Sequence, residues 1–251
     1  MIGIFDSGVG GLSVFREIRK LLPEERYIYY SDNAHCPYGE KSREYITDRA
    51  REITRLLLSN EADIIVVACN TATAAAISTL REEFPVKFIG MEPAVKPAAM
   101  STRTGVVGVL ATAGTLKADK YLNIREKWAE GVKIVEHVGQ GFVELVEKGC
   151  TNGPEAEKVV VESLKPLLDE GADRIVLGCT HYPFLSETIS KAAASIAPER
   201  DIKVIDPAPA VAKHLMEIMK QEGLIRKEGF QMDLKASGDN TILNETYGKL
   251  I

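Results

Sequence analysis

The sequence predicts an α/β fold of two pseudosymmetric lobes, each a mostly parallel sheet flanked by helices. Short apolar runs alternate with longer amphipathic runs along the 251 residues, which is typical of parallel sheets covered by helices. Residues 62–71 (ADIIVVACNT) are closely repeated as residues 172–181 (ADRIVLGCTH). The chain is also long enough to bury a sizeable core, as one large domain or as two lobes of about 100 residues each.

The apolar runs give the strands that we expect, in chain order: 2–5, 27–30, 64–68, 88–91, 105–110, 132–136, 175–178 and 203–205. Apolar residues spaced by four, three and four positions predict a helix with one apolar face before the third strand. They are Ile46, Ala50, Ile53 and Leu57. A second such stripe precedes the seventh strand: Val160, Leu164, Leu167 and Leu168.

The repeat extends beyond the two cysteine segments. Residues 2–5 (IGIF) resemble 107–110 (VGVL), and a proline segment at 91–95 (MEPAV) resembles 205–208 (IDPA). Each half therefore runs strand, strand, cysteine strand, strand. We expect 1–96 and 208–251 to form the first lobe with Cys69, and 97–207 the second with Cys179. The tail returns to the first lobe because its helix over 211–221 and its turn at 237–239 come too late for the second repeat.

Composition narrows the classes of function. The formal net charge is −5 at pH 7, and no basic run is present, which argues against a nucleic-acid partner. No apolar run reaches the roughly 18 residues of a membrane span, and the first residues do not resemble a secretory signal. We therefore expect a cytoplasmic protein. The scattered positions of Cys36, Cys69, Cys150 and Cys179 favour thiols over disulfides.

Cys69 and Cys179 are the strongest candidates for chemistry. Each follows an expected strand, at the end where ligands bind in parallel sheets, and we expect each to begin the next helix. Donors at a helix N-terminus stabilise a thiolate and lower its pKa from about 8.5. The alternative for either cysteine is a small apolar core residue, but polar side chains follow both: Asn70, Thr71, Thr180 and His181. Two equivalent thiols facing one pocket suit racemisation.

Two other chemistries stay open. Ligand-type residues occur as Cys179-x-His181 and His35-Cys36, although no C-x-x-C pair supports a structural zinc site. The loop at 6–13 (DSGVGGLS) has glycines that let the backbone approach an anion, but it matches neither a P-loop nor a full dinucleotide motif. Asp32 follows the second strand, where a ribose-binding acid would lie, so a nucleotide-binding oxidoreductase is an alternative.

Four motifs resemble those of the glutamate racemase family, in that family's order: 6–12 (DSGVGGL), 37–42 (PYGEKS), 68–72 (ACNTA) and 177–183 (LGCTHYP). The turn at 237–239 (SGD) also fits, so the resemblance covers nearly the whole chain. It implies a cofactor-independent racemase with no metal, whose active site lies between two pseudosymmetric lobes. It also implies glutamate as substrate, a homodimer, and supply of D-glutamate for bacterial peptidoglycan.

The resemblance implies a role for each matched residue. Cys69 and Cys179 would be the acid/base pair, with Cys179 deprotonating L-glutamate and Cys69 deprotonating D-glutamate. Asp6 would assist Cys69, while His181 and Glu147 would assist Cys179; a solvated helix charge is the alternative for Glu147. The candidate glutamate-binding residues are Asp6, Ser7, Tyr38, Gly39, Asn70, Thr71, Thr112, Thr115, Thr180 and His181.

The sequence is also compatible with three alternative functions. Aspartate racemase, or another two-cysteine isomerase, is one, because a single methylene is worth only about 1–3 kcal/mol in a pocket. A thiol redox protein would form a disulfide between its cysteines. A non-catalytic amino-acid binder would show affinity without deuterium incorporation at Cα.

Overall fold

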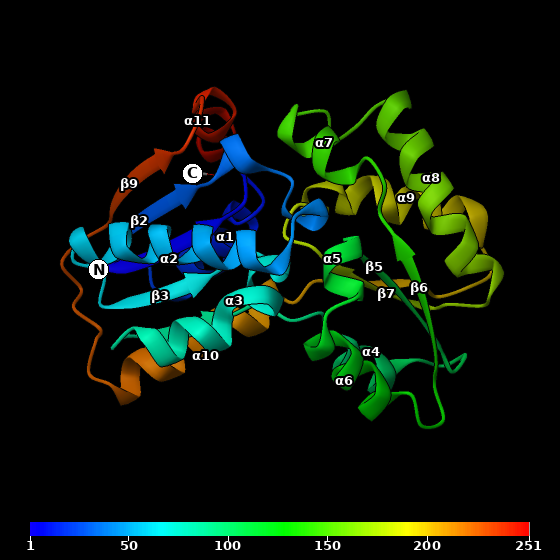
Figure 1. The fold of residues 1–251 in the computed structure, drawn as a ribbon. Coiled ribbons are helices and arrows are strands. Elements are labelled where there is room, and N and C mark those ends of the chain that lie inside the picture. The colour runs from blue at the N-terminus through cyan, green and yellow to red at the C-terminus, as the bar shows by residue number, and fades with distance from the viewer. Residues whose placement is uncertain (251) are drawn as a thin grey trace. The chain divides into compact units, whose positions relative to one another are not determined.

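The computed structural model describes residues 1–250 and divides into two units. The first lobe comprises Met1–Met91 and the tail from Ala208 onward, and the second lobe comprises Glu92–Pro207. Each lobe is built on a parallel sheet flanked by helices (Figure 1), which confirms the predicted fold class.

Within residues 1–250, the first lobe has a five-stranded parallel sheet in the order β4-β3-β1-β2-β9. The strands are β1 (Ile2–Asp6), β2 (Arg26–Ser31), β3 (Ile64–Val67), β4 (Lys87–Gly90) and β9 (Gln231–Ala236). The α-helices are α1 (Leu12–Leu21), α2 (Arg43–Ser59), α3 (Asn70–Glu83), α10 (Ala208–Gln221) and α11 (Thr241–Gly248), and the 3₁₀ helices are η1 (Asn33–His35) and η2 (Tyr38–Glu40).

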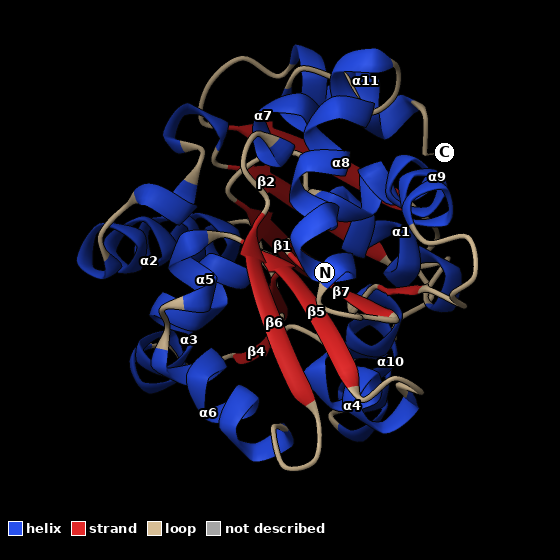
Figure 2. Ribbon diagram, turned by 90° about the vertical axis from the view of Figure 1, so that its right-hand side faces the viewer, coloured by secondary structure: helices blue, strands red, loops and turns tan. Residues whose placement is uncertain are grey.

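The second lobe, in the same described range, has a four-stranded parallel sheet in the order β6-β5-β7-β8. The strands are β5 (Val106–Ala111), β6 (Lys133–Val138), β7 (Arg174–Gly178) and β8 (Lys203–Ile205). The helices are α4 (Val95–Ser101), α5 (Ala113–Leu116), α6 (Asp119–Trp128), α7 (Phe142–Glu147), α8 (Pro154–Asp169), the 3₁₀ helix η3 (Tyr182–Leu185) and α9 (Ser186–Ile196). Figure 2 shows β5 and β6 side by side.

The two sheets have one topology, as the internal repeat predicts. Read as β4-β3-β1-β2 and β8-β7-β5-β6, the first four strands of each lobe follow the same order. The cysteine strand, β3 or β7, lies beside the first strand of its lobe in both cases. The repeat therefore fixes Cys69 and Cys179 at equivalent ends of equivalent strands.

The predicted apolar stripes form the core against which these strands pack. In the first lobe, α2 packs against α3, and the buried stripe of α2 belongs to one cluster with Phe5, Ile65 and Val67 of the sheet. In the second lobe, α8 packs against α9 and contacts β5 and β6. Two further pairs of helices pack together: α1 with α10 in the first lobe, and α4 with α6 in the second.

Gly3 of β1 and Gly108 of β5 occupy equivalent positions, and each leaves room for a leucine of the helix that covers its strand. A Cβ on Gly3 would lie 3.3 Å from Leu57 Cδ1, and a Cβ on Gly108 would lie 3.0 Å from Leu167 Cδ1. The chain then leaves both helices in the same way, because Ala62 N–H donates to Leu57 O and Ala172 N–H to Leu167 O, each at 3.1 Å. The repeat thus extends to individual backbone hydrogen bonds.

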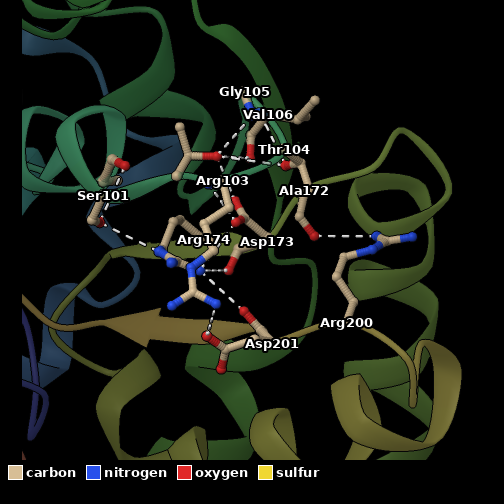
Figure 3. Close-up of polar contacts among 12 residues, drawn as sticks. Ser101, Arg103, Thr104, Gly105, Val106, Ala172, Asp173, Arg174, Arg200 and Asp201 are labelled. Atoms are coloured by element: carbon tan, nitrogen blue, oxygen red, sulfur yellow. Dashed lines mark hydrogen bonds and ion pairs between the residues drawn. The ribbon is translucent and has the colours of Figure 1, made fainter.

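Asp173 holds the opposite end of β7 from Cys179. Its carboxylate accepts a hydrogen bond from the Thr102 hydroxyl at 2.5 Å. It also accepts from Arg103 N–H at 2.8 Å and pairs with Arg174 at 3.2 Å (Figure 3). Both Asp173 and Arg174 are 2% exposed. Burial alone would raise the pKa of Asp173, but these donors and the Arg174 charge hold it below its usual value.

No helix within residues 1–250 has the length and apolar character that a membrane span requires.

Candidate active site

Cys69 lies where β3 gives way to α3, and it is the N-cap residue of that helix. Its Sγ accepts a hydrogen bond from Ala72 N–H at 3.4 Å, and its thiol is 3.8 Å from Ser7 Oγ. Cys69 is 5% exposed. Because the first N–H groups of a helix have no partner within the helix, they stabilise a negative charge on the sulfur.

Asp6 is the last residue of β1, the strand beside β3, and Ser7 follows it in the chain. Both are buried, and Asp6 Oδ1 accepts a hydrogen bond from Gly8 N–H at 2.9 Å. The loop that follows packs too tightly for a side chain at Gly11, where a Cβ would lie 2.7 Å from Tyr29 Oη. This glycine is therefore required by packing around Asp6.

Asn70 and Thr71 form the first turn of α3 and are buried at 3% and 5% exposure. Within the described residues, neither Oδ1 nor Nδ2 of Asn70 has a hydrogen-bond partner. A buried amide without partners costs about 1–3 kcal/mol, so native proteins rarely retain one without a reason. Asn70 therefore offers a donor and an acceptor, one residue from the sulfur, to a polar molecule.

Tyr38 and Gly39 lie in η2, which packs against α3. Tyr38 is buried and donates a hydrogen bond to Asp32 Oδ2 at 2.5 Å. Burial raises the pKa of Tyr38 well above its usual value, and the charges of Asp32 and Cys69 raise it further. The phenol thus stays protonated as a donor.

Asp32 does not lie where a ribose could use it. It is fully buried, and its carboxylate binds the Arg49 guanidinium, the Tyr38 hydroxyl and His35 Nδ1. Its acceptor positions are already occupied, which removes the residue that supported the nucleotide-binding alternative.

Cys179 follows β7 but does not begin an α-helix, so that expectation was wrong. The chain makes a turn in which Tyr182 N–H bonds Cys179 O at 3.2 Å, and η3 comes next before α9 begins at Ser186. These bonds span three residues and are typical of a 3₁₀ turn, and Pro183 has no N–H with which to continue an α-helical ladder. Cys179 is 8% exposed.

Two side chains stand beside Cys179 in place of a helix N-terminus. Its Sγ is 3.7 Å from His181 Nδ1, and His181 Nε2 is 2.5 Å from Glu147 Oε1. His181 is buried, and Glu147, the last residue of α7, is only 21% exposed. A carboxylate that accepts from one ring nitrogen fixes the imidazole beside the thiol. Thr180, at 2% exposure, lies between Cys179 and His181 in the chain.

Tyr182 joins the elements that carry His181 and Glu147. Its hydroxyl donates to Gly139 O at 3.3 Å, and its ring contacts Phe142 of α7 edge-on at 4.8 Å. Burial raises the pKa of Tyr182 well above its usual range, and the charges of Cys179 and Glu144 add to the rise. This tyrosine therefore acts as a neutral packing residue behind the thiol.

Thr112 and Thr115 follow β5 and make a local capping contact. Thr112 is the N-cap of α5, where its Oγ1 accepts from Thr115 N–H at 3.2 Å and its hydroxyl lies 3.0 Å from Thr115 Oγ1. In this geometry both threonines take part in the N-terminal cap of α5.

Arg49 and Tyr182 were not selected from the sequence. Tyr182 lies inside a matched motif, which was the available signal. Arg49 looks like any charge on the solvent side of a helix, and only the fold brings it to Asp32, 17 residues away.

Comparison with known proteins gives one consistent result. The family model "Asp/Glu/Hydantoin racemase" matches residues 2–215. A protein named glutamate racemase from Ectopseudomonas mendocina is 48% identical over 231 residues, which cover 92% of this chain and 86% of the relative.

Solved structures agree with the sequence relatives. A glutamate racemase isoform of Bacillus anthracis matches with a TM-score of 0.87 at 31% identity, over 99% of this chain and 92% of the other. The Escherichia coli glutamate racemase, solved with L-glutamate and the activator UDP-MurNAc-Ala, matches with a TM-score of 0.81 at 33% identity, over 94% and 97% of the two chains.

Proposed function

Because the chain belongs to the Asp/Glu/Hydantoin racemase family, we propose that it interconverts L-glutamate and D-glutamate through Cys69 and Cys179. The observation that carries this proposal is the pair of buried cysteines at equivalent strand ends of a repeated sheet, one accepting from Ala72 N–H and the other facing the His181 ring. Racemisation is the reaction whose two directions each need a base on one face and an acid on the other.

In the proposed mechanism, the Cys179 thiolate takes the α-proton of L-glutamate and the Cys69 thiol donates a proton to the opposite face. The C–H electron pair remains on Cα until the second proton arrives, and the product is D-glutamate. The reverse direction exchanges the roles of the two sulfurs. Asp6 assists Cys69 in this scheme, and the His181–Glu147 pair assists Cys179.

The substrate carboxylates need donors that are already in place, because the α-proton is very weakly acidic and charge develops as it leaves. The Asn70 amide supports this role, since it is buried beside Cys69 without a protein partner. We assign substrate binding also to Ser7, the Tyr38–Gly39 segment, Thr71 and Thr180. Thr112 and Thr115 are weaker assignments, because each already serves the start of α5.

The proposal includes a biological setting. All four cysteines are thiols, and catalytic thiols persist in a reducing compartment, which supports the cytoplasm as the place of reaction. We propose that the D-glutamate serves peptidoglycan synthesis. A homodimer, which the resemblance implies, would be tested by sedimentation.

The experiment uses purified protein with L-glutamate in D₂O and no added cofactor or metal. Optical rotation and deuterium at Cα are followed together. Loss of rotation, with deuterium in the new D-glutamate, is the expected result. Binding of glutamate without exchange would contradict the proposal. Exchange with aspartate but not with glutamate would identify aspartate as the substrate instead.

A further inference from the structure

A buried ion pair behind the Cys69 side of the site has no role in the mechanism above. Asp32 follows β2, and its N–H donates to Asp6 O at 2.9 Å. Arg49, on α2, binds the Asp32 carboxylate with two nitrogens, Nε at 2.9 Å and Nη2 at 2.8 Å. The Arg49 side chain is 17% exposed and Asp32 is fully buried.

The same carboxylate holds the η2 segment. The Tyr38 hydroxyl donates to Asp32 Oδ2, the oxygen that Arg49 Nε also binds. Tyr38 in turn belongs to the apolar cluster that contains Cys69. A continuous line of contacts therefore runs from Arg49 through Asp32 and Tyr38 to the surroundings of the thiol.

We propose that Arg49 is a positioning residue for racemisation, which acts through Asp32 to hold Tyr38 and the Gly39 backbone in their substrate-binding place. This inference rests on the proposed function. A buried carboxylate needs a paired cation and satisfied oxygens to stay ionised. The two-nitrogen fork of arginine supplies both the charge and a fixed direction, which a lysine would not.

The charges around Asp32 support this role. The titratable and charged groups that face it are Arg49, Tyr38, His35 and Tyr30, and Glu52 pairs with Arg49 from the next turn of α2. Burial alone would raise the pKa of Asp32, but the hydrogen bonds from Arg49, Tyr38 and His35 hold it below its usual value. Asp32 therefore stays a charged acceptor for the Tyr38 hydroxyl down to a lower pH than an ordinary aspartate would.

Removing the guanidinium weakens this balance. In an Arg49→Met variant, the hydrogen bonds from Tyr38 and His35 remain, but the two hydrogen bonds and the charge of Arg49 no longer offset burial, so the pKa of Asp32 rises. The carboxylate then protonates at a higher pH than in the parent, and it ceases to be a charged acceptor for Tyr38. The acid limb of kcat/KM should move to higher pH, and the loss should lie mainly in KM.

The test compares Arg49→Met with Arg51→Met, a matched control on the same helix. Arg51 binds Glu83 and Asp48 on the surface and has no contact with Asp32. We expect Arg49→Met to lower kcat/KM about 10- to 100-fold and Arg51→Met to stay within about twofold. Arg49→Lys should fall between them, because it keeps the charge without the fork.

A second comparison separates positioning from general stability. In a Tyr38→Phe background the contact to Asp32 is gone, so Arg49→Met should cost much less than it does in the parent. Equal costs in the two backgrounds would overturn the inference, as would parent-like KM and acid limb in Arg49→Met.

If Arg49→Met does not fold, Arg49→Lys decides: a folded Lys variant with unchanged KM and acid limb overturns the proposal. An unmutated protein that does not racemise glutamate instead contradicts the proposed function, so the two failures are distinguishable.

Discussion

Cys69 and Cys179 occupy equivalent positions in a repeated sheet, yet different groups surround them. Cys69 caps a helix and receives a backbone N–H from Ala72. Cys179 sits in a turn and faces His181, which Glu147 holds from behind. The repeat thus fixes where each thiol lies, while the chain after the strand determines which groups contact its sulfur.

This difference has a defined kinetic consequence. Two enantiomers have equal free energy, so the kcat/KM values of a racemase in its two directions must be equal. A substitution beside one thiol therefore cannot lower kcat/KM for one enantiomer without lowering it equally for the other. It can make proton transfer at one face more rate-limiting, and an isotope effect measured with each Cα-deuterated enantiomer detects this.

The largest expected effect comes from removing either sulfur. Cys69→Ser and Cys179→Ser should each lower racemisation of both enantiomers by about 10³-fold or more, because a serine hydroxyl is a much weaker acid and every turnover needs both groups. Polarimetry measures the rates. Cys150→Ser, at an exposed thiol, is the control with unchanged rates, and full racemisation by either active-site variant would rule out the two-base scheme.

Next in size are substitutions of the neighbours that differ between the two thiols. His181→Asn and Asp6→Asn should each lower kcat/KM by about 10²-fold, equally in both directions. With His181→Asn the isotope effect should rise for deuterated L-glutamate and fall for D-glutamate. Asp6→Asn should give the opposite pattern. The same pattern in both variants would contradict the assignment of one thiol to each enantiomer.

The two lobes should also differ in how much the aspartate before the cysteine strand contributes to the free energy of unfolding. These aspartates are Asp63 before β3 and Asp173 before β7. Asp173→Ala leaves the buried Arg174 without its carboxylate and should cost about 3 kcal/mol. Asp63→Ala should cost about 1 kcal/mol or less, because Asp63 is 31% exposed in its pairs with Arg226 and the Met1 amino group. Urea unfolding measures both, and equal costs would contradict the comparison.

The contribution of Asp173 to the free energy of unfolding depends on pH. Its pKa in the folded state is lowered, so its stabilisation is fully present above the pKa of the unfolded chain. It is lost as the pH falls through the lowered folded value. The difference in unfolding free energy between the parent and Asp173→Ala should therefore shrink in acid.

A similarly small effect is expected at Thr112, which is the N-cap of α5 as Ser42 is of α2. Thr112→Ala and Ser42→Ala should each lower the unfolding free energy by about 1 kcal/mol. A KM that rises for both enantiomers in Thr112→Ala alone would identify a substrate contact, whereas parallel behaviour would leave Thr112 as a cap.

The strands of the fold were predictable because buried parallel strands read as apolar runs; 203–205 matches β8, and the others shift at their ends by one or two residues. β9 was missed. Its apolar residues alternate with Gln231, Asp233 and Lys235 in a half-buried edge strand. Its partner β2 lies 205 residues earlier in the sequence, which no local pattern reveals.

The internal repeat predicted the positions of the two thiols, and the family resemblance named His181 and Glu147, which contact one another beside Cys179. The matched segments located both thiols, but they also suggested two matched helix starts. The turn after Cys179 broke that symmetry through tertiary contacts with α7, which supplies Glu147. The Arg49–Asp32 pair depends likewise on the fold, because neither residue carries a sequence pattern that points to the other.

The place of β9 has a consequence for how the chain acquires its structure during synthesis. The first sheet closes on its β2 edge only when residues from beyond the whole second lobe arrive. The second lobe is continuous in sequence, so it can complete its own sheet while the first still lacks a strand. Ribosome-bound chains ending near residue 235 should resist protease over 92–207 before they do so over 1–91. In such a chain, the part that is translated first would be the last to be finished.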